Sequence, residues 1–261
     1  SSITPLFISK FSQDPEFYRR IYPATIRPQA KDIIRTWLYY TMLRCYQLTG
    51  KLAWPNVWIM GFGVDEKGKK MSKSKGNVVD PLPLIQKYGA DTFRFWSASE
   101  TNLGQDFRCS EQSISNSQKF LSKLWNLGRF LSSFEVPKEF SIELLKNNNL
   151  LHTDKWILAE LDKLINSCIK GYNSYNFFIP ATSIRDFTWN VFASHYVEMI
   201  KGRAYDNENK NSQISSIYTL HRCFSIILLL VAPICPFITE KLWKTLYSSE
   251  SIHNQKFPKT N

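Results

Sequence analysis

Residues 55–77 are PNVWIMGFGVDEKGKKMSKSKGN, and this stretch decides the fold of the first part of the chain. Its apolar segment, residues 57–60, lies between Pro55 and Gly61 and predicts a buried parallel β-strand. The polar segment that follows, residues 65–77, holds five lysines and two glycines, which is typical of an exposed, mobile loop.

The segments around this stretch predict helices. An apolar helical pattern runs from Asp32 to Gly50, a natural C-terminal stop, and two short helices are expected over residues 81–88 and 90–97. The order helix, strand, loop, helix is that of the second half of a Rossmann-like, doubly wound α/β domain. Residues 1–28 are rich in proline and serine and are predicted to be irregular.

Beyond about residue 110 the sequence predicts helices and no strand. Pro180 and Pro236 lie where helices are expected to start, a position at which proline is tolerated. The fold class is therefore α/β followed by an all-α helical bundle, with a linker at residues 147–149. The helical periods cover residues 111–134, 154–172, 180–205, 212–232 and 236–247.

The charge and the cysteines narrow the class of protein. Lys and Arg number 33 against 22 Asp and Glu, a formal net charge of +11. Such a surface attracts polyanions, although a merely solvated basic face has about equal weight on this ground alone.

The five cysteines are odd in number and form no Cys-x-x-Cys pair, so neither a zinc site nor a disulfide framework is expected. We expect no protein-bound metal, and reduced thiols in the cytoplasm.

No membrane association is expected from the sequence. The longest apolar run, residues 224–236, contains two prolines and is too short to span a bilayer, and no signal peptide is recognised. The chain opens in what resembles the middle of a loop, so we expect a fragment of a longer protein.

The lysine-rich loop is suited to a triphosphate. Ammonium groups are compact point charges that meet phosphate oxygens. A lysine that meets a departing pyrophosphate stabilises the transition state more than the ground state. A solvated hairpin tip would have the same composition, and composition alone gives the two interpretations about even weight.

The order of residues in the loop distinguishes the two interpretations. Lys70-Met71-Ser72-Lys73-Ser74 matches the KMSKS signature of class I aminoacyl-tRNA synthetases, and residues 75–94 resemble the valine, isoleucine and leucine subgroup. The resemblance implies that Lys70 and Lys73 are catalytic and bind the phosphates of ATP, which enters with Mg²⁺ as a substrate. It also implies that Met71, Ser72 and Ser74 complete the loop, with both serines donating to phosphate.

Residues upstream of the loop resemble the valine branch of this subgroup, in its archaeal form. The run from Ile26 to Trp37 carries the likeness. It implies that Asp32 binds the ATP ribose, that Gly61 lets the backbone approach adenine, and that Trp37 lines the amino-acid pocket. Helix capping by Asp32 and a core position for Trp37 are the structural alternatives.

The helical half resembles the anticodon-binding bundle of the same subgroup, through residues 154–158, 195–198, 232–243 and 251–253. This implies that basic side chains contact tRNA phosphates. Each candidate is, taken singly, better explained as a solvated charge. The aromatic residues Trp156, Tyr196, Phe237 and Trp243 are expected in the core rather than against RNA. The tRNA-binding candidates are Lys119, Lys123 and Arg129, which share one predicted helix, and Lys201 and Arg203.

The resemblance divides the chain into three parts. Residues 1–100 would be the C-terminal half of the catalytic domain with the signature loop, residues 101–150 a connecting region that contacts the tRNA stem, and residues 151–261 the anticodon-binding bundle. The N-terminal half of the nucleotide fold, with its His-x-Gly-His signature, and the editing domain are not in this sequence. The 261 residues alone are therefore expected to be inactive.

Three functions remain open from the sequence. The first is a fragment of a ligase that joins valine to tRNA, with ATP, valine, tRNA and the missing half of the enzyme as partners. The second is the isoleucine counterpart. The third is a non-catalytic RNA-binding module derived from a synthetase, against which the intact Lys70–Ser74 loop argues.

Overall fold

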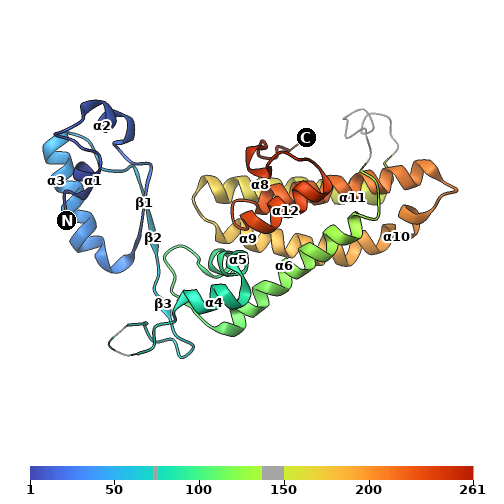
Figure 1. The fold of residues 1–261 in the computed structure, drawn as a ribbon, viewed down its shortest axis with the longest axis horizontal. Helices are drawn as coiled ribbons and strands as arrows, with labels where there is room; N and C mark the ends of the chain where they lie inside the picture. The colour runs from blue at the N-terminus through green and yellow to red at the C-terminus, as the bar shows by residue number, and fades with distance from the viewer. Residues whose placement is uncertain (73, 75, 137–149, 261) are drawn as a thin grey trace. The chain divides into compact units, whose positions relative to one another are not determined.

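The computed structural model describes residues 1–72, 74, 76–136 and 150–260, and the chain forms two compact units (Figure 1). The α/β unit comprises Ser1–Val78 and Thr101–Cys109, and the helical unit comprises Val79–Glu100 and Ser110–Asn261. The predicted linker at residues 147–149 lies outside the described residues. Each unit is therefore built from two separate segments of sequence.

The first 30 residues of the α/β unit are ordered, so the prediction of an irregular segment is wrong. They form helices α1 (Thr4–Ile8) and α2 (Pro15–Ile21) and strand β1 (Ile26–Ala30). Proline lies in the first turn of both helices, where its missing N–H is not needed. Asp14 caps α2 by accepting a 3.0 Å hydrogen bond from the backbone N–H of Phe17.

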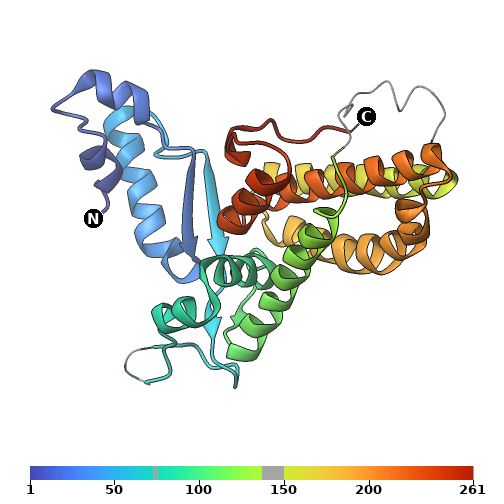
Figure 2. The same cartoon turned by 45° about the vertical axis from the view of Figure 1, so that its right-hand side comes forward.

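Two parallel strands lie beside the helices of the α/β unit. Strand β2 (Asn56–Met60) pairs with β1 along its whole length, with Gln29 opposite Ile59, and Figure 2 shows the two strands side by side. The predicted parallel strand is confirmed, although its residues are half-buried or exposed rather than buried. A second, shorter parallel pair joins β3 (Gly63–Val64) to β4 (Phe107–Arg108).

The crossover between β1 and β2 is helical from Lys31 to Thr49. It comprises a 3₁₀ turn (Lys31–Ile33), a π-helical segment (Ile34–Leu38) and helix α3 (Tyr39–Thr49). Gly50 ends α3 with a φ of 67°, which confirms it as the C-terminal stop. The core of this unit is small and consists of Leu6, Tyr22, Cys45, Ala53 and Trp54.

The helical unit confirms the predicted bundle, and the part of it that the structure describes contains no strand. Its elements follow the sequence periods to within a few residues at most ends. They are α4 (Pro81–Tyr88), α5 (Ala90–Glu100), α6 (Glu111–Leu131), α8 (His152–Asn173), α9 (Phe178–Asp186), the π-helical η4 (Phe187–Tyr196), α10 (Val197–Tyr205), α11 (Lys210–Val231), α12 (Pro236–Leu246) and the short η5 (Ile252–Asn254).

Helix α11 lies in the core of the bundle. It is long and apolar enough to cross a membrane by composition, with a mean hydropathy of 1.7, but 78% of that apolar window is buried inside the protein. Side chains around its circumference, such as Ile227, Leu228, Leu230 and Val231, are fully buried. Packing against the other helices thus accounts for its apolar surface.

Polar contacts join α5 to the start of α12. The Asp91 carboxylate accepts hydrogen bonds from the backbone N–H groups of Ile238 (2.6 Å) and Phe237 (3.4 Å), at the positive end of the helix. The Arg94 Nε donates to the Ile234 carbonyl at 2.7 Å. Asp91 and Arg94, which lie in the segment 75–94 that resembles the synthetase subgroup, therefore attach α5 to the start of α12.

The four aromatic residues expected in the core differ in their positions. Tyr196 is fully buried and Trp243 packs on the core, which confirms the expectation for these two residues. Phe237 is 68% exposed and Trp156 is 38% exposed, so for them the expectation is wrong. Both occur early in a helix, where the periodicity leaves the buried face poorly defined.

Candidate functional site

The signature loop is attached to strand β3 by backbone pairing. Val64 and Lys70 form an antiparallel bridge, and the Met71 N–H donates to the Gly63 carbonyl at 3.3 Å. The Asp65 N–H donates to the Lys69 carbonyl at 2.9 Å, which closes the turn between them. Residues 66–70 are exposed, as predicted for this loop. The first lysine of the signature therefore has a fixed backbone and an exposed side chain.

Lys70 contacts the residue that the sequence predicts to bind ribose. Its Nζ lies 3.3 Å from the Asp32 carboxylate, and both side chains are about half exposed, at 52% and 46%. The same Nζ lies 3.7 Å from the centre of the Phe62 ring, a cation–π contact. The structure thus brings together two of the candidate ATP-binding residues.

Asp106 stabilises the position of Phe62. Its carboxylate accepts hydrogen bonds from the Phe62 backbone N–H (2.8 Å) and from Lys31 Nζ (2.7 Å). The hydrogen bond from Lys31 lowers the pKa of Asp106, as does the bond from Phe62. Lys31 Nζ lies 4.9 Å from the Phe62 ring, so lysines approach this ring from two segments. Neither Phe62 nor Asp106 was predicted from the sequence.

Gly61 lies where two backbone segments meet closely. A Cβ atom at this position would lie 1.8 Å from the Gln105 carbonyl oxygen, far inside van der Waals contact. The chain's own backbone therefore requires glycine here. Its predicted approach to adenine stays a prediction.

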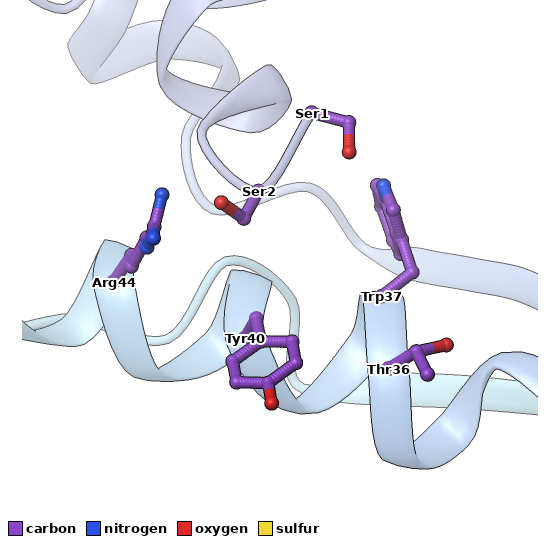
Figure 3. Close-up of a pocket in the computed structure, with 6 residues that line it drawn as sticks. All are labelled: Ser1, Ser2, Thr36, Trp37, Tyr40 and Arg44. Atoms are coloured by element: carbon purple, nitrogen blue, oxygen red, sulfur yellow. The ribbon is translucent and has the colours of Figure 1, made fainter.

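Trp37 packs against another tryptophan and also borders a pocket. Its ring stacks on Trp54 at 5.7 Å with an angle of 4° between the planes, and the Arg27 guanidinium lies 4.1 Å from the ring centre. Trp37 also lines a pocket of about 370 Å³ (Figure 3). The amino-acid role of Trp37 stays a prediction. The other residues that line the pocket are Ser1, Ser2, Thr36, Tyr40 and Arg44.

The remaining loop residues are only partly described. The hydroxyl groups of Ser72 and Ser74 lie 3.2 Å apart. Met71 packs against the β3 backbone, because a Cβ at Gly63 would lie 2.7 Å from its terminal methyl. Lys73, the second predicted catalytic lysine, lies outside the described residues.

Asp32 is not the N-cap residue of the crossover helix, so this structural alternative is wrong. It lies within the first turn, after Ala30 at the cap position, and its carboxylate interacts with Lys70 instead. An acidic residue in the first turn still interacts favourably with the helix dipole.

The basic candidates in the helical unit are accessible to different degrees. On α6, Lys119 and Arg129 are exposed and Lys123 is half-buried, with its Nζ 5.7 Å from the centre of the Trp189 ring. Lys201 pairs with Glu198 at 2.6 Å on the surface. These four side chains are near enough to the solvent to meet an anion.

Arg203 belongs to a buried network. Its guanidinium binds the Asp154 carboxylate in a bidentate pair, with distances of 2.9 and 2.7 Å, and the Tyr196 hydroxyl donates to the same carboxylate at 2.8 Å. Asp154 is fully buried and the Arg203 side chain is 18% exposed. This geometry favours a structural role for Arg203, whose predicted tRNA contact stays untested.

No group of three or more His, Cys, Asp or Glu side chains that could hold a metal ion occurs among the residues that the structure describes. The five cysteines are buried free thiols.

Two family models match the chain. The model of class I tRNA synthetases (I, L, M and V) matches residues 2–110, and the model of the anticodon-binding domain of tRNA ligase matches residues 154–261. The first match includes the signature loop and Asp32, and the second includes Lys201 and Arg203.

Curated relatives match over almost the whole chain. The chain is 43% identical to a valine–tRNA ligase of Aeropyrum pernix over 99% of its length, and 41% identical to one of Pyrobaculum aerophilum over 98%. In both comparisons the chain spans 31% of the length of the relative.

Solved structures share the fold. A LeuRS of Agrobacterium radiobacter, solved as a ternary complex with tRNA and LeuAMS, has a TM-score of 0.75 at 18% identity, covering 98% of this chain and 32% of that one. A methionyl-tRNA synthetase of Mycobacterium tuberculosis, in complex with methionyl-adenylate, has a TM-score of 0.74 at 24% identity, covering 92% and 47%. Residues 2–110 therefore match the model of the class I tRNA synthetases, and the chain is similar to valine–tRNA ligases along almost all of its own length.

Proposed function

We propose that the chain is the part of a valine–tRNA ligase that supplies the phosphate-binding loop and the tRNA-binding bundle. The complete polypeptide activates valine with ATP and then transfers it to tRNA. The observation that carries this proposal is the 43% identity over 99% of the chain, together with an intact Lys70–Ser74 loop.

The ion pair between Lys70 and Asp32 suits a nucleotide site. Because both side chains are about half exposed, the pair contributes at most about 1 kcal/mol. A ribose hydroxyl that donates to Asp32 can therefore displace Lys70 at small cost. The released ammonium group then meets the phosphates of ATP, which enters with Mg²⁺ as a substrate.

The lysines of the loop stabilise the departing pyrophosphate. Negative charge grows on this group when the valine carboxylate attacks the α-phosphate, so a lysine placed there lowers the barrier more than it strengthens binding. Lys70 and Lys73 have this role in the proposal. Ser72 and Ser74 donate hydrogen bonds to the phosphates.

The helical unit binds tRNA in this proposal. Lys119, Lys123, Arg129 and Lys201 supply positive charge to its phosphates. The domain boundaries at residues 100 and 150 are part of the proposal, and so is a cytoplasmic location, which suits five free thiols.

Amino-acid-dependent exchange of pyrophosphate into ATP tests the proposal. The complete polypeptide should use valine, with kcat/KM at least about tenfold above that for isoleucine. The 261-residue chain alone should show no exchange. Preference for isoleucine would identify the isoleucine enzyme instead. A complete polypeptide that binds tRNA but shows no exchange with any amino acid would be a non-catalytic RNA-binding module.

A further inference from the structure

Asn77 connects the two sides of the signature loop. Its side-chain Nδ2 donates to the Asp65 carboxylate at 2.8 Å, and its Oδ1 accepts from the Ser72 backbone N–H at 3.0 Å. Nδ2 also lies 3.4 Å from the Lys70 carbonyl. A single half-buried amide thus contacts Asp65 at the start of the loop and two residues of the signature, Lys70 and Ser72.

Asp65 completes this arrangement from the other side. While one carboxylate oxygen accepts from Asn77, the other accepts from the backbone N–H groups of Lys69 (2.8 Å) and Lys67 (3.0 Å). The hydrogen bond from Asn77, followed by that from Lys69, lowers the pKa of Asp65. The carboxylate is therefore ionised at neutral pH and binds both the turn and the amide.

We infer that Asp65 and Asn77, which we name the clasp, are positioning residues for amino-acid activation. The inference rests on the proposed function and extends it to two residues that need not touch ATP. The clasp fixes the backbone at Lys69 and at Ser72, which lie on the two sides of Lys70. Lys70 then loses less conformational freedom when it meets the phosphates.

An exchange of the two side chains gives a matched test. Asn77→Asp puts a carboxylate against the Asp65 carboxylate and removes the donor, so the clasp opens by repulsion. Asp65→Asn keeps one acceptor oxygen, which can serve Asn77 or the turn but not both. The double variant Asp65→Asn/Asn77→Asp restores one donor and one acceptor with the net charge unchanged.

In the complete polypeptide we expect kcat for valine-dependent exchange to fall at least about tenfold in Asn77→Asp, since a hydrogen bond to a charged group is lost. The KM for valine and the affinity for tRNA should stay within about twofold of the unmodified values, because neither ligand meets the clasp. The double variant should recover most of the lost rate. If the two residues only stabilised the fold, the loss and the recovery would not be confined to kcat.

Hydrogen exchange of the Ser72 amide in the 261-residue chain gives a readout that is independent of activity. Its protection should fall in Asn77→Asp and return in the double variant. Lost protection with an unchanged kcat would overturn the positioning role, and so would unchanged protection in Asn77→Asp. An unmodified polypeptide without any exchange activity would overturn the proposed function itself, and the two failures are thereby distinguished.

Discussion

The two units hold their charged side chains in opposite ways. In the helical unit, Asp154 is fully buried against Arg203, with Tyr196 as a further donor. In the α/β unit, the pairs Lys70–Asp32 and Lys31–Asp106 are each about 40–50% exposed. A buried pair is costly to break, whereas an exposed pair exchanges easily with water or a ligand.

The hydrophobic cores of the two units also differ in extent. The helical unit has one continuous core through its long helices, and the α/β unit has a core of a few side chains around Tyr22 and Trp54. Stability is therefore concentrated in the bundle, and exchangeable charge is concentrated around the signature loop. Substitutions in the two units should affect different measurements.

The largest effect is expected from Asp154→Ala. It leaves the Arg203 guanidinium largely buried without its carboxylate, which should lower the free energy of unfolding by about 3–5 kcal/mol. Denaturation by urea, followed by circular dichroism, measures this change. Lys201→Ala is the control, because loss of its exposed pair with Glu198 should cost at most about 1 kcal/mol. Equal costs for both variants would remove the distinction between the units.

The pH dependence of the free energy of unfolding gives a second test of the Asp154–Arg203 pair. Burial alone would raise the pKa of Asp154, but hydrogen bonds from Arg203 and Tyr196 and the charge of Arg203 more than offset it, so the pKa is lowered. A lowered pKa gives stability that is complete above the ordinary value of 3.8 and is lost as the pH falls through the folded-state value. The difference between the unmodified chain and Asp154→Ala should therefore shrink below about pH 4.

A smaller effect is expected on tRNA binding from the basic face of α6. If Lys119 and Lys123 each meet a phosphate, the double alanine variant should reduce the slope of log K against log salt concentration by about 2. Lys163→Ala on α8, which removes an exposed lysine paired with Glu160, is the control and should leave the slope unchanged. A double variant with the slope of the unmodified protein would show that these lysines are only solvated charges.

The positions of the long helices in the helical unit were predictable from the sequence. Apolar side chains recur at the helical period over 20 residues or more in α6, α8 and α11, and Pro236 marks the start of α12. The short elements at the start of the chain were not predictable. α1, α2 and β1 span five to seven residues each, too few for a period to show, and Leu6 and Tyr22 hold them by packing near Trp54.

The site was predictable only where the loop has a recognisable order of residues. Lys70 and Asp32 were identified from the resemblance, whereas their contact joins residues 38 positions apart and is formed only in the fold. Phe62 and Asp106 were missed because they are separated by 44 residues and meet only through the fold. Asn77 and Asp65 carried a usable signal, since Asp and Asn side chains commonly bond the backbone N–H groups of nearby turns.

The most direct test measures both activities of one variant. In the complete polypeptide, Lys70→Ala/Lys73→Ala should slow the formation of valyl-adenylate at least about 100-fold, because the departing pyrophosphate loses its cations. The Kd for tRNA should change by less than about twofold, since the bundle is untouched. A variant that forms adenylate at the normal rate, or that loses rate and tRNA affinity equally, would contradict the division of work between the loop and the bundle.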